Sequence, residues 1–367
     1  MNIDKMKLKT DERAIFALRE LYGKYGYSQY KMSKFEEYDL YVRNKNFLIS
    51  DNIITFTDTN GKLMALKPDV TLSIIKNSKD EADQLQKVYY NENVYRISGS
   101  TKAFREIMQV GLECIGQIDD YSIFEVLMLA AESIKTISAE SELDISHLGI
   151  VSEVLDRIGL FGEDRNEILR LIGDKNIHDI KTVCNKAGIT DADAELLKNL
   201  IAIYGKPADV LPKLKNVYGG IVSPDLINSL ETIVLALENS GYKDMIRIDF
   251  SVVNDMSYYN GIVFKGFING VPTGVLSGGQ YDKLLRKMGK KSRAIGFAVY
   301  LDMLERLTDD GERFDVDTIV LYSEKQPLGE LTARINEITS AGKSVLAVKS
   351  LPENIKYKEL IELGKGE

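Results

Sequence analysis

The N-terminal part of the chain alternates between helical and strand-like spacing of its apolar residues. Apolar side chains recur every three or four positions over residues 11–26, which predicts a helix that ends at a glycine. Residues 31–40 and 47–56 have the shorter spacing of strands. The turn residues Asp-Thr-Asn-Gly at 58–61 then favour a hairpin into a further strand at 63–66.

A helix is predicted next, over residues 71–77. Lys-Pro-Asp stops the preceding strand, and Asp69 or Thr71 lies near the helix cap. Strand patterns follow at 88–90 and 94–97, separated by a short break. These elements form the first part of a predicted core.

The next predicted strand, residues 105–115, has one mostly apolar face and one polar face. The polar face carries, in order, Arg105, Ile107, Gln109, Gly111 and Glu113. A half-exposed antiparallel strand whose polar side meets water would explain this pattern. Arg96 weakens that interpretation, because it lies one strand earlier and could point into the same concavity.

The middle of the chain, residues 119–240, reads as mostly helical. From 141 to 240 short amphipathic segments with glycine and proline punctuation predict a helical insertion between two halves of one sheet. Strands resume at 246–252 and 258–267. An Asn-Gly pair then favours a hairpin into a return strand at 271–276.

Helices are predicted over 283–288 and 295–307. Because hairpins dominate, the fold class is α+β, an antiparallel sheet flanked by helices. Its core comprises residues 1–140 and 241–310. Residues 313–367 form one βαβ unit, a truncated C-terminal segment too small for a full doubly wound domain.

The amino-acid composition argues against several classes of function. The 367 residues include 47 basic and 55 acidic side chains, a net charge of −8, which argues against a main task of holding nucleic acid. Two scattered cysteines and two scattered histidines exclude a Cys/His metal site and argue against a histidine-dependent nucleophile. The charged first twenty residues indicate neither a signal peptide nor a membrane anchor, so we expect a cytoplasmic protein without a cofactor.

Polar and tyrosine side chains gather at the predicted ends of neighbouring strands. Tyr258, Tyr259, Tyr281 and the run Ser277-Gly278-Gly279 would supply rigid walls and an approachable backbone. Arg96 offers a cation for a carboxylate, Glu113 an anion for an ammonium, and Gln109 an amide. The combination predicts a pocket for a small zwitterion.

Five segments, which span most of residues 1–307 in order, resemble the catalytic core of the class II aminoacyl-tRNA synthetases, and within them the histidyl branch. They are residues 66–71, 94–96 with 104–113, 258–264, 278–282 and 294–298. The resemblance implies a class II synthetase fold. It also implies that the histidine site is lined by Asp69, Thr71, Arg96, Gln109, Glu113, Tyr258, Tyr259 and Tyr281.

The departures from the histidyl pattern concern ATP. The acidic and basic residues that the family carries after Arg96 are replaced by Ile-Ser-Gly-Ser at 97–100. Asn254 and Met303 stand where the family has arginines, and Gln280 replaces another arginine. Since adenylation needs cations to meet the charge of its transition state, we expect no catalytic residues and no aminoacylation.

A pocket without the ATP apparatus resembles the synthetase paralogues that serve as regulatory subunits of ATP phosphoribosyltransferase. The resemblance implies a short-form catalytic subunit as partner, histidine as feedback effector, and a hetero-octamer built on synthetase-like dimers. A divergent histidyl-tRNA synthetase and an orphan amino-acid sensor with another partner remain as alternatives.

Overall fold

The structure is a computed structural model that describes residues 9–45, 53–80, 84–97, 103–253, 256, 258–306 and 314–363. The chain divides into two compact units, Met1–Leu307 and Thr308–Glu367.

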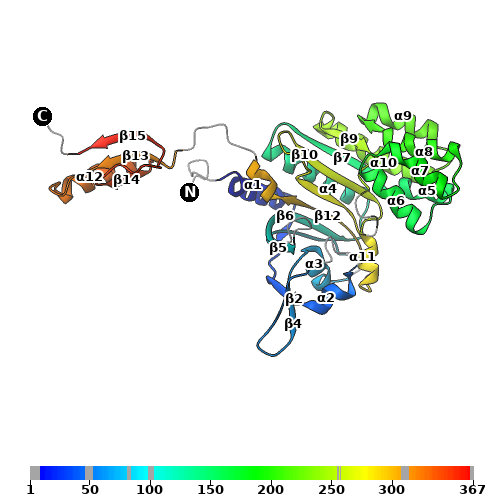
Figure 1. The fold of residues 1–367 in the computed structure, drawn as a ribbon, viewed down its shortest axis with the longest axis horizontal. Helices are drawn as coiled ribbons and strands as arrows, with labels where there is room; N and C mark the ends of the chain where they lie inside the picture. The colour runs from blue at the N-terminus through cyan, green and yellow to red at the C-terminus, as the bar shows by residue number, and fades with distance from the viewer. Residues whose placement is uncertain are drawn as a thin grey trace. The chain divides into compact units, whose positions relative to one another are not determined.

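The first unit is built on one large sheet, which has nine strands within the described ranges (Figure 1). Their order across the sheet is β1 (Ser28–Gln29), β5 (Gln86–Ile97), β6 (Phe104–Gly116), β12 (Arg293–Tyr300), β11 (Leu276–Gln280), β10 (Ile262–Ile268), β7 (Ser141–His147), β9 (Ile246–Asp249) and β8 (Tyr204–Gly205). Neighbours are antiparallel except β1 with β5 and β7 with β9. The α+β class is confirmed, with a mixed rather than a purely antiparallel sheet.

Two helices cover one face of this sheet, α1 (Thr10–Lys24) and α4 (Asp120–Ile137). The apolar side of β6, represented by Val110 and Leu112, belongs to the same buried cluster as these helices. Asp119 fixes the start of α4, because its Oδ1 accepts a hydrogen bond from the Ser122 amide at 2.8 Å. The opposite, polar side of β6 is therefore free to line a site.

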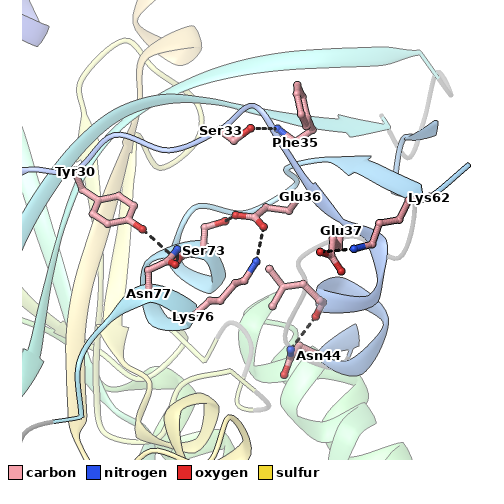
Figure 2. A network of polar contacts seen from close by, with 11 residues as sticks. Tyr30, Ser33, Phe35, Glu36, Glu37, Asn44, Lys62, Ser73, Lys76 and Asn77 are labelled. Carbon is pink, nitrogen blue, oxygen red and sulfur yellow. Dashed lines mark hydrogen bonds and ion pairs between the residues drawn. The ribbon is translucent and has the colours of Figure 1, made fainter. Parts of the chain in front are cut away.

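On that opposite side lie α3 (Thr71–Asn77), α11 (Asp282–Lys287) and a small antiparallel sheet. The small sheet has the order β2 (Phe35–Glu37), β4 (Leu63–Leu66) and β3 (Thr55–Thr57), and α2 (Tyr38–Arg43) follows β2. Figure 2 shows how Glu36 holds α3: its carboxylate accepts from Lys76 Nζ at 2.7 Å and from Ser73 Oγ at 3.5 Å. The Tyr30 hydroxyl donates to the Ser73 carbonyl at 3.4 Å. The small sheet thus fixes the helix whose first turn reaches the site.

A run of helices separates β7 from β9. They are α5 (Leu148–Ile158), α6 (Gly162–Gly173), α7 (Ile177–Lys186), α8 (Asp191–Ala202), α9 (Pro207–Tyr218), α10 (Pro224–Leu237) and the short π-helix η3 (Glu238–Tyr242). The chain enters the run at His147, whose Nδ1 accepts from the Gly149 amide at 3.1 Å, and α5 ends at Gly159 with a φ of 81°. No helix in the described part of the chain is long and apolar enough to cross a membrane.

The second unit is a small parallel sheet with one helix. Its strands have the order β14 (Val345–Val348), β13 (Val316–Leu321) and β15 (Tyr357–Glu362), and α12 (Leu328–Ser340) connects β13 to β14. Val320, Leu331 and Ile338 form its buried cluster. The predicted βαβ unit is present, and β15 is an additional strand that the sequence pattern did not indicate.

Several predicted elements differ from the observed ones in the first unit. Residues 38–43 are helical rather than part of a strand, and β5 runs without the predicted break. The stretch from 119 to 240 was predicted to be mostly helical, but Ser141–His147 forms β7 inside the main sheet. Its alternation of Leu143 and Ile145 with polar residues was a strand signal that the flanking helices obscured.

The C-terminal part of the core contains the largest error. Residues 295–307 were predicted to form a helix, whereas Arg293–Tyr300 is strand β12 and only Leu301–Arg306 is helical, as the 3-10 helix η4. A central strand buried on both faces is a continuous apolar run, which periodicity alone does not distinguish from a helix. The return strand of the predicted hairpin is Leu276–Gln280, not 271–276, because the loop that contains Gly270 is longer than a two-residue turn.

Candidate functional site

A cavity of about 230 Å³ lies on the polar side of the main sheet; we call it the sheet cavity. The structure brings all eight predicted site residues to its wall: Asp69, Thr71, Arg96, Gln109, Glu113, Tyr258, Tyr259 and Tyr281. They come from β5, β6, the first turn of α3 and the segments that flank β10 and α11. The cavity therefore gathers residues that are up to about two hundred positions apart, as the motif pattern predicted.

Glycines opposite the polar residues give the cavity its depth. Gly296 of β12 pairs with Glu113 of β6, and a Cβ atom on Gly296 would lie 1.8 Å from Glu113 Oε2 and 2.5 Å from the Leu112 carbonyl oxygen. A Cβ on Gly111 would lie 2.4 Å from the Tyr90 hydroxyl oxygen. Only glycine leaves room for these side chains at both positions.

Glu113 is the most enclosed acid of the cavity, with an exposure of 2%. Thr71 Oγ1 donates to its Oε1 at 2.6 Å, and the Tyr281 hydroxyl donates to its Oε2. Burial raises the pKa of Glu113 to about 8, although both hydroxyl bonds act to lower it. The protonated form of the carboxyl is therefore favoured at neutral pH, and a cationic ligand would favour its ionised form.

Asp69 and Arg96 supply a second acid and a cation. Asp69 Oδ1 accepts from the Leu72 amide at 2.9 Å, which holds the first turn of α3 from the residue before its cap, Val70. Burial raises the pKa of the Asp69 carboxyl, and the Leu72 amide and the Arg96 guanidinium oppose that rise. Arg96 Nε donates to the Pro68 carbonyl at 3.0 Å, so its guanidinium is held beside the same turn.

Three tyrosines form one wall. The ring centroids of Tyr258 and Tyr259 are 4.7 Å apart, and those of Tyr258 and Tyr281 are 5.7 Å apart. Burial raises the pKa of both Tyr258 and Tyr281 well above the ordinary value. Their hydroxyls are therefore neutral, and they can donate hydrogen bonds without adding charge.

Three further polar residues line the wall and were not predicted to belong to it: Tyr90, Lys265 and Tyr300. The Tyr300 hydroxyl lies 2.9 Å from Oγ of Ser277, which belongs to the predicted Ser277-Gly278-Gly279 run. Tyr90 was recoverable, because in an antiparallel pair it shares a face with Gly111. Lys265 and Tyr300 required the pairing order of β10, β11 and β12, which the chain does not reveal.

Gln280 does not line the cavity. Its exposure is 4%, and its Oε1 accepts a hydrogen bond from the Ile262 amide at 2.8 Å. A Cβ on Gly261 would lie 2.1 Å from that same oxygen. The side chain that replaces the family arginine thus secures the start of β10 and leaves the cavity wall to its neighbours.

Only some of the positions that depart from the synthetase pattern lie within the residues that the structure describes. Asn254 and Ser98–Ser100 lie outside the described residues. Met303 lies in η4, and its Sδ accepts from Thr273 Oγ1 at 3.6 Å. Among the described residues of the cavity wall, the cationic side chains are Arg96 and Lys265. The described part of the chain also contains no group of three or more His, Cys, Asp or Glu placed to hold a metal ion.

Sequence comparisons connect this geometry to known proteins. The family model described as histidyl-tRNA synthetase matches residues 2–304. An ATP phosphoribosyltransferase regulatory subunit of Caldanaerobacter subterraneus subsp. tengcongensis is 32% identical over 289 residues, which are 77% of this chain and 75% of the relative.

Solved structures show the same fold. A protein described as an ATP phosphoribosyltransferase regulatory subunit/histidyl-tRNA synthetase from Bacillus halodurans has a TM-score of 0.76 at 23% identity, over 96% of this chain and 93% of that one. A chain of an ATP phosphoribosyl transferase (HisG:HisZ) complex from Thermotoga maritima has a TM-score of 0.64 at 19% identity, over 80% and 98% of the two chains. The predicted class II synthetase-like fold is confirmed.

Proposed function

Because this chain belongs to the histidyl-tRNA synthetase-like family of ATP phosphoribosyltransferase regulatory subunits, we propose that it is the non-catalytic partner of a short-form catalytic subunit. The partner would carry out the first step of histidine biosynthesis, and this chain would make it responsive to histidine. We further propose the hetero-octamer built on dimers of this chain that the family resemblance implies.

The observation that carries the proposal is the charge pattern of the sheet cavity. It combines buried carboxyl groups, one guanidinium and neutral tyrosine hydroxyls in a space suited to an amino acid. In the proposed mode Glu113 holds the ligand ammonium and Arg96 its carboxylate, with Gln109 beside them. Ionisation of Glu113 on binding would pair its carboxylate with the ligand ammonium.

Feedback would work by linkage. A histidine molecule that binds one arrangement of the assembly better than another shifts the equilibrium by its differential affinity, typically ~1 to 3 kcal/mol. The sheet cavity supports this role because α3, which carries Thr71, is also bonded to the small sheet through Glu36. A ligand that rearranges the Thr71–Glu113 contact would therefore act on an element that extends beyond the cavity.

The test is reconstitution with a short-form catalytic subunit. We expect the two chains to elute together from a sizing column, the catalytic rate to rise on mixing, and histidine to reduce that rate. The matched control is the same mixture with Glu113→Gln, which should still form the complex but lose the histidine response. Failure of the chains to associate would overturn the regulatory assignment and favour an amino-acid sensor with another partner.

A divergent histidyl-tRNA synthetase is the second candidate, favoured by the family model and by the retained Arg96. Histidine-dependent exchange between pyrophosphate and ATP distinguishes the two. We expect none, because Met303 offers no charge to a triphosphate. Asn254→Arg should not restore exchange by itself, since Met303 and Ser98 remain. Detectable exchange by the unaltered chain would instead establish the synthetase.

A further inference from the structure

A second cavity, which we call the insertion cavity, opens between the main sheet and the turn that joins α6 to α7. Its volume is about 260 Å³. Strands β7, β9 and β10 lie side by side in the main sheet (Figure 1). The turn contributes Gly173, Asp174 and Lys175 to the cavity, and the three strands contribute Asp144, Asp249 and Lys265, respectively. Lys265 and Val252 also line the sheet cavity, so the two cavities adjoin.

Most charged groups of the insertion cavity already have partners. Asp249 Oδ2 lies 2.7 Å from Lys175 Nζ, and Asp249 Oδ1 accepts from the Ser251 amide at 2.8 Å. Asp174 Oδ2 accepts from Arg170 Nη1 at 2.9 Å. These pairs form a charged frame that is complete without a ligand.

Two opposite charges of the cavity form no ion pair among the described residues. Asp144 is only 6% exposed, and its buried Oδ1 has no hydrogen-bond partner there. Lys175, which is paired with Asp249, attracts the Asp144 carboxylate from beyond ion-pair distance, and the Glu142 carboxyl opposes its charge. Lys265 Nζ makes no hydrogen bond or ion pair within the described part of the chain and lies 5.5 Å from the centroid of the Phe267 ring. Asp144 and Lys265 are directly paired across β7 and β10, so both side chains leave the same face of the sheet.

The unpaired carboxyl is energetically unfavourable as it stands. A buried acceptor without a donor loses the hydrogen bonds that it makes to water in the unfolded chain. Burial, with the Asp249 carboxylate as second cause, raises the pKa of Asp144 to about 7. A cationic group of a ligand would donate a hydrogen bond to Asp144 and favour its ionised carboxylate. An anionic group of a ligand would pair with the Lys265 ammonium.

We propose that the insertion cavity binds a small zwitterion, whose ammonium group contacts Asp144 Oδ1 and whose carboxylate contacts Lys265 Nζ. One unpaired charge of each sign favours a zwitterion over a plain amine or a plain acid. A divalent metal ion fits less well, because the three carboxylates that line the cavity, Asp144, Asp174 and Asp249, are not placed to hold one ion together. The site is separate from the one proposed for histidine, although Lys265 lines both cavities.

The test uses the purified full chain and three probes of similar size in titration calorimetry: β-alanine, propylamine and propionate. We expect saturable binding of β-alanine, with each singly charged probe roughly tenfold weaker or more. Asp144→Asn should weaken β-alanine by about the same factor, since it keeps the shape and removes the charge. Asp174→Asn is the matched control, because Asp174 lines the cavity but is already bonded to Arg170.

The two cavities should bind histidine and β-alanine independently, so each variant should lose only one of the two ligands. Glu113→Gln should remove histidine binding and leave β-alanine unchanged, and Asp144→Asn should do the reverse, so failure of one site does not imply failure of the other. Thermal unfolding of each variant checks that it is folded. Lack of saturable β-alanine binding, equal binding to Asp144→Asn, or equal binding of propylamine would overturn the proposal.

Discussion

The two ends of strand β6 carry charged side chains in opposite environments, one buried and one exposed. At its C-terminal end Glu113 is buried and both its oxygens accept hydroxyl hydrogen bonds. At its N-terminal end the Arg105 side chain is 52% exposed and forms an ion pair of 3.2 Å with Asp302, next to Met303. The buried Glu113 carboxyl lines a cavity that a ligand could enter, whereas the exposed Arg105 guanidinium is already paired with a carboxylate of the same chain.

This difference in burial predicts that the buried end of β6 contributes more to ligand recognition than the exposed end. A charged group in a buried environment interacts strongly with a ligand, and the same group in water is screened. The end proposed to bind an amino acid therefore holds a buried carboxyl group, and the other end offers a methionine and a paired arginine. Substitutions at the buried end are therefore expected to have larger effects than substitutions at the exposed end.

Removal of the Glu113 carboxyl should have the largest effect. We expect Glu113→Ala to weaken histidine binding by at least about a hundredfold, because it deletes the proposed ammonium partner and leaves two buried hydroxyls without an acceptor. Calorimetric titration measures the loss. Glu20→Ala, on the exposed face of α1, is the control and should bind normally. Unchanged affinity of Glu113→Ala would remove Glu113 from the site.

Filling the space opposite Glu113 should come next. Gly296→Ala places a methyl group against Glu113 Oε2 and the Leu112 backbone, and backbone does not move aside readily. We expect the free energy of unfolding to fall by about 1 to 3 kcal/mol in urea titrations, with weaker histidine binding. Gly23→Ala is the matched control, since nothing lies within 4 Å of its Cβ and it is helical. Equal stability of the two variants would contradict the tight packing described here.

A pH dependence of stability follows from the raised pKa of Glu113. Burial raises that pKa from an ordinary 4.5 to about 8, so the folded chain holds a proton that the unfolded chain has released. The free energy of unfolding should therefore decrease as pH rises from 4.5 towards 8, by up to about 1.4 kcal/mol per pH unit. Below 4.5 both states are protonated and the contribution is constant.

Urea titrations of the unaltered chain and of Glu113→Gln measure this slope. The variant cannot titrate at that position, so its stability should decline less over the same interval. Asp144 has a pKa raised to about 7 by burial and contributes a slope of the same sign, but it contributes to both proteins and cancels in the difference. Parallel slopes would mean that Glu113 is ionised in the folded chain.

The buried end was accessible to sequence reasoning because its signals are local. Strict alternation along residues 105–115 places Gln109 and Glu113 on one face without knowledge of any partner strand. The Lys-Pro-Asp stop before α3 likewise places Asp69 and Thr71 at a helix start. That all eight residues belong to one site was implied by the resemblance to the histidyl-tRNA synthetases, and all eight line one cavity.

The features that sequence reasoning missed depend on tertiary pairing. Strand β12 is buried on both faces, so its apolar run has no period that separates a strand from a helix. The hydrogen bond of Gln280 to the Ile262 amide arises only when β10 and β11 pair. The insertion cavity combines β7 and β10 with a turn between helices, and its unpaired Asp144 is invisible until β7 is recognised as a strand.

The smallest effect is expected at the exposed end. Arg105→Ala removes the ion pair with Asp302, and exposed pairs of this kind contribute about 0 to 1 kcal/mol because water and salt screen them. We expect the free energy of unfolding in urea to change by less than about 1 kcal/mol and the affinity for histidine to remain the same. Arg96→Ala is the contrasting variant, because its guanidinium lies on the cavity wall and should be required for histidine binding. A loss of histidine affinity in Arg105→Ala equal to that in Arg96→Ala would show that recognition extends along the whole of β6, and the contrast between its two ends would no longer hold.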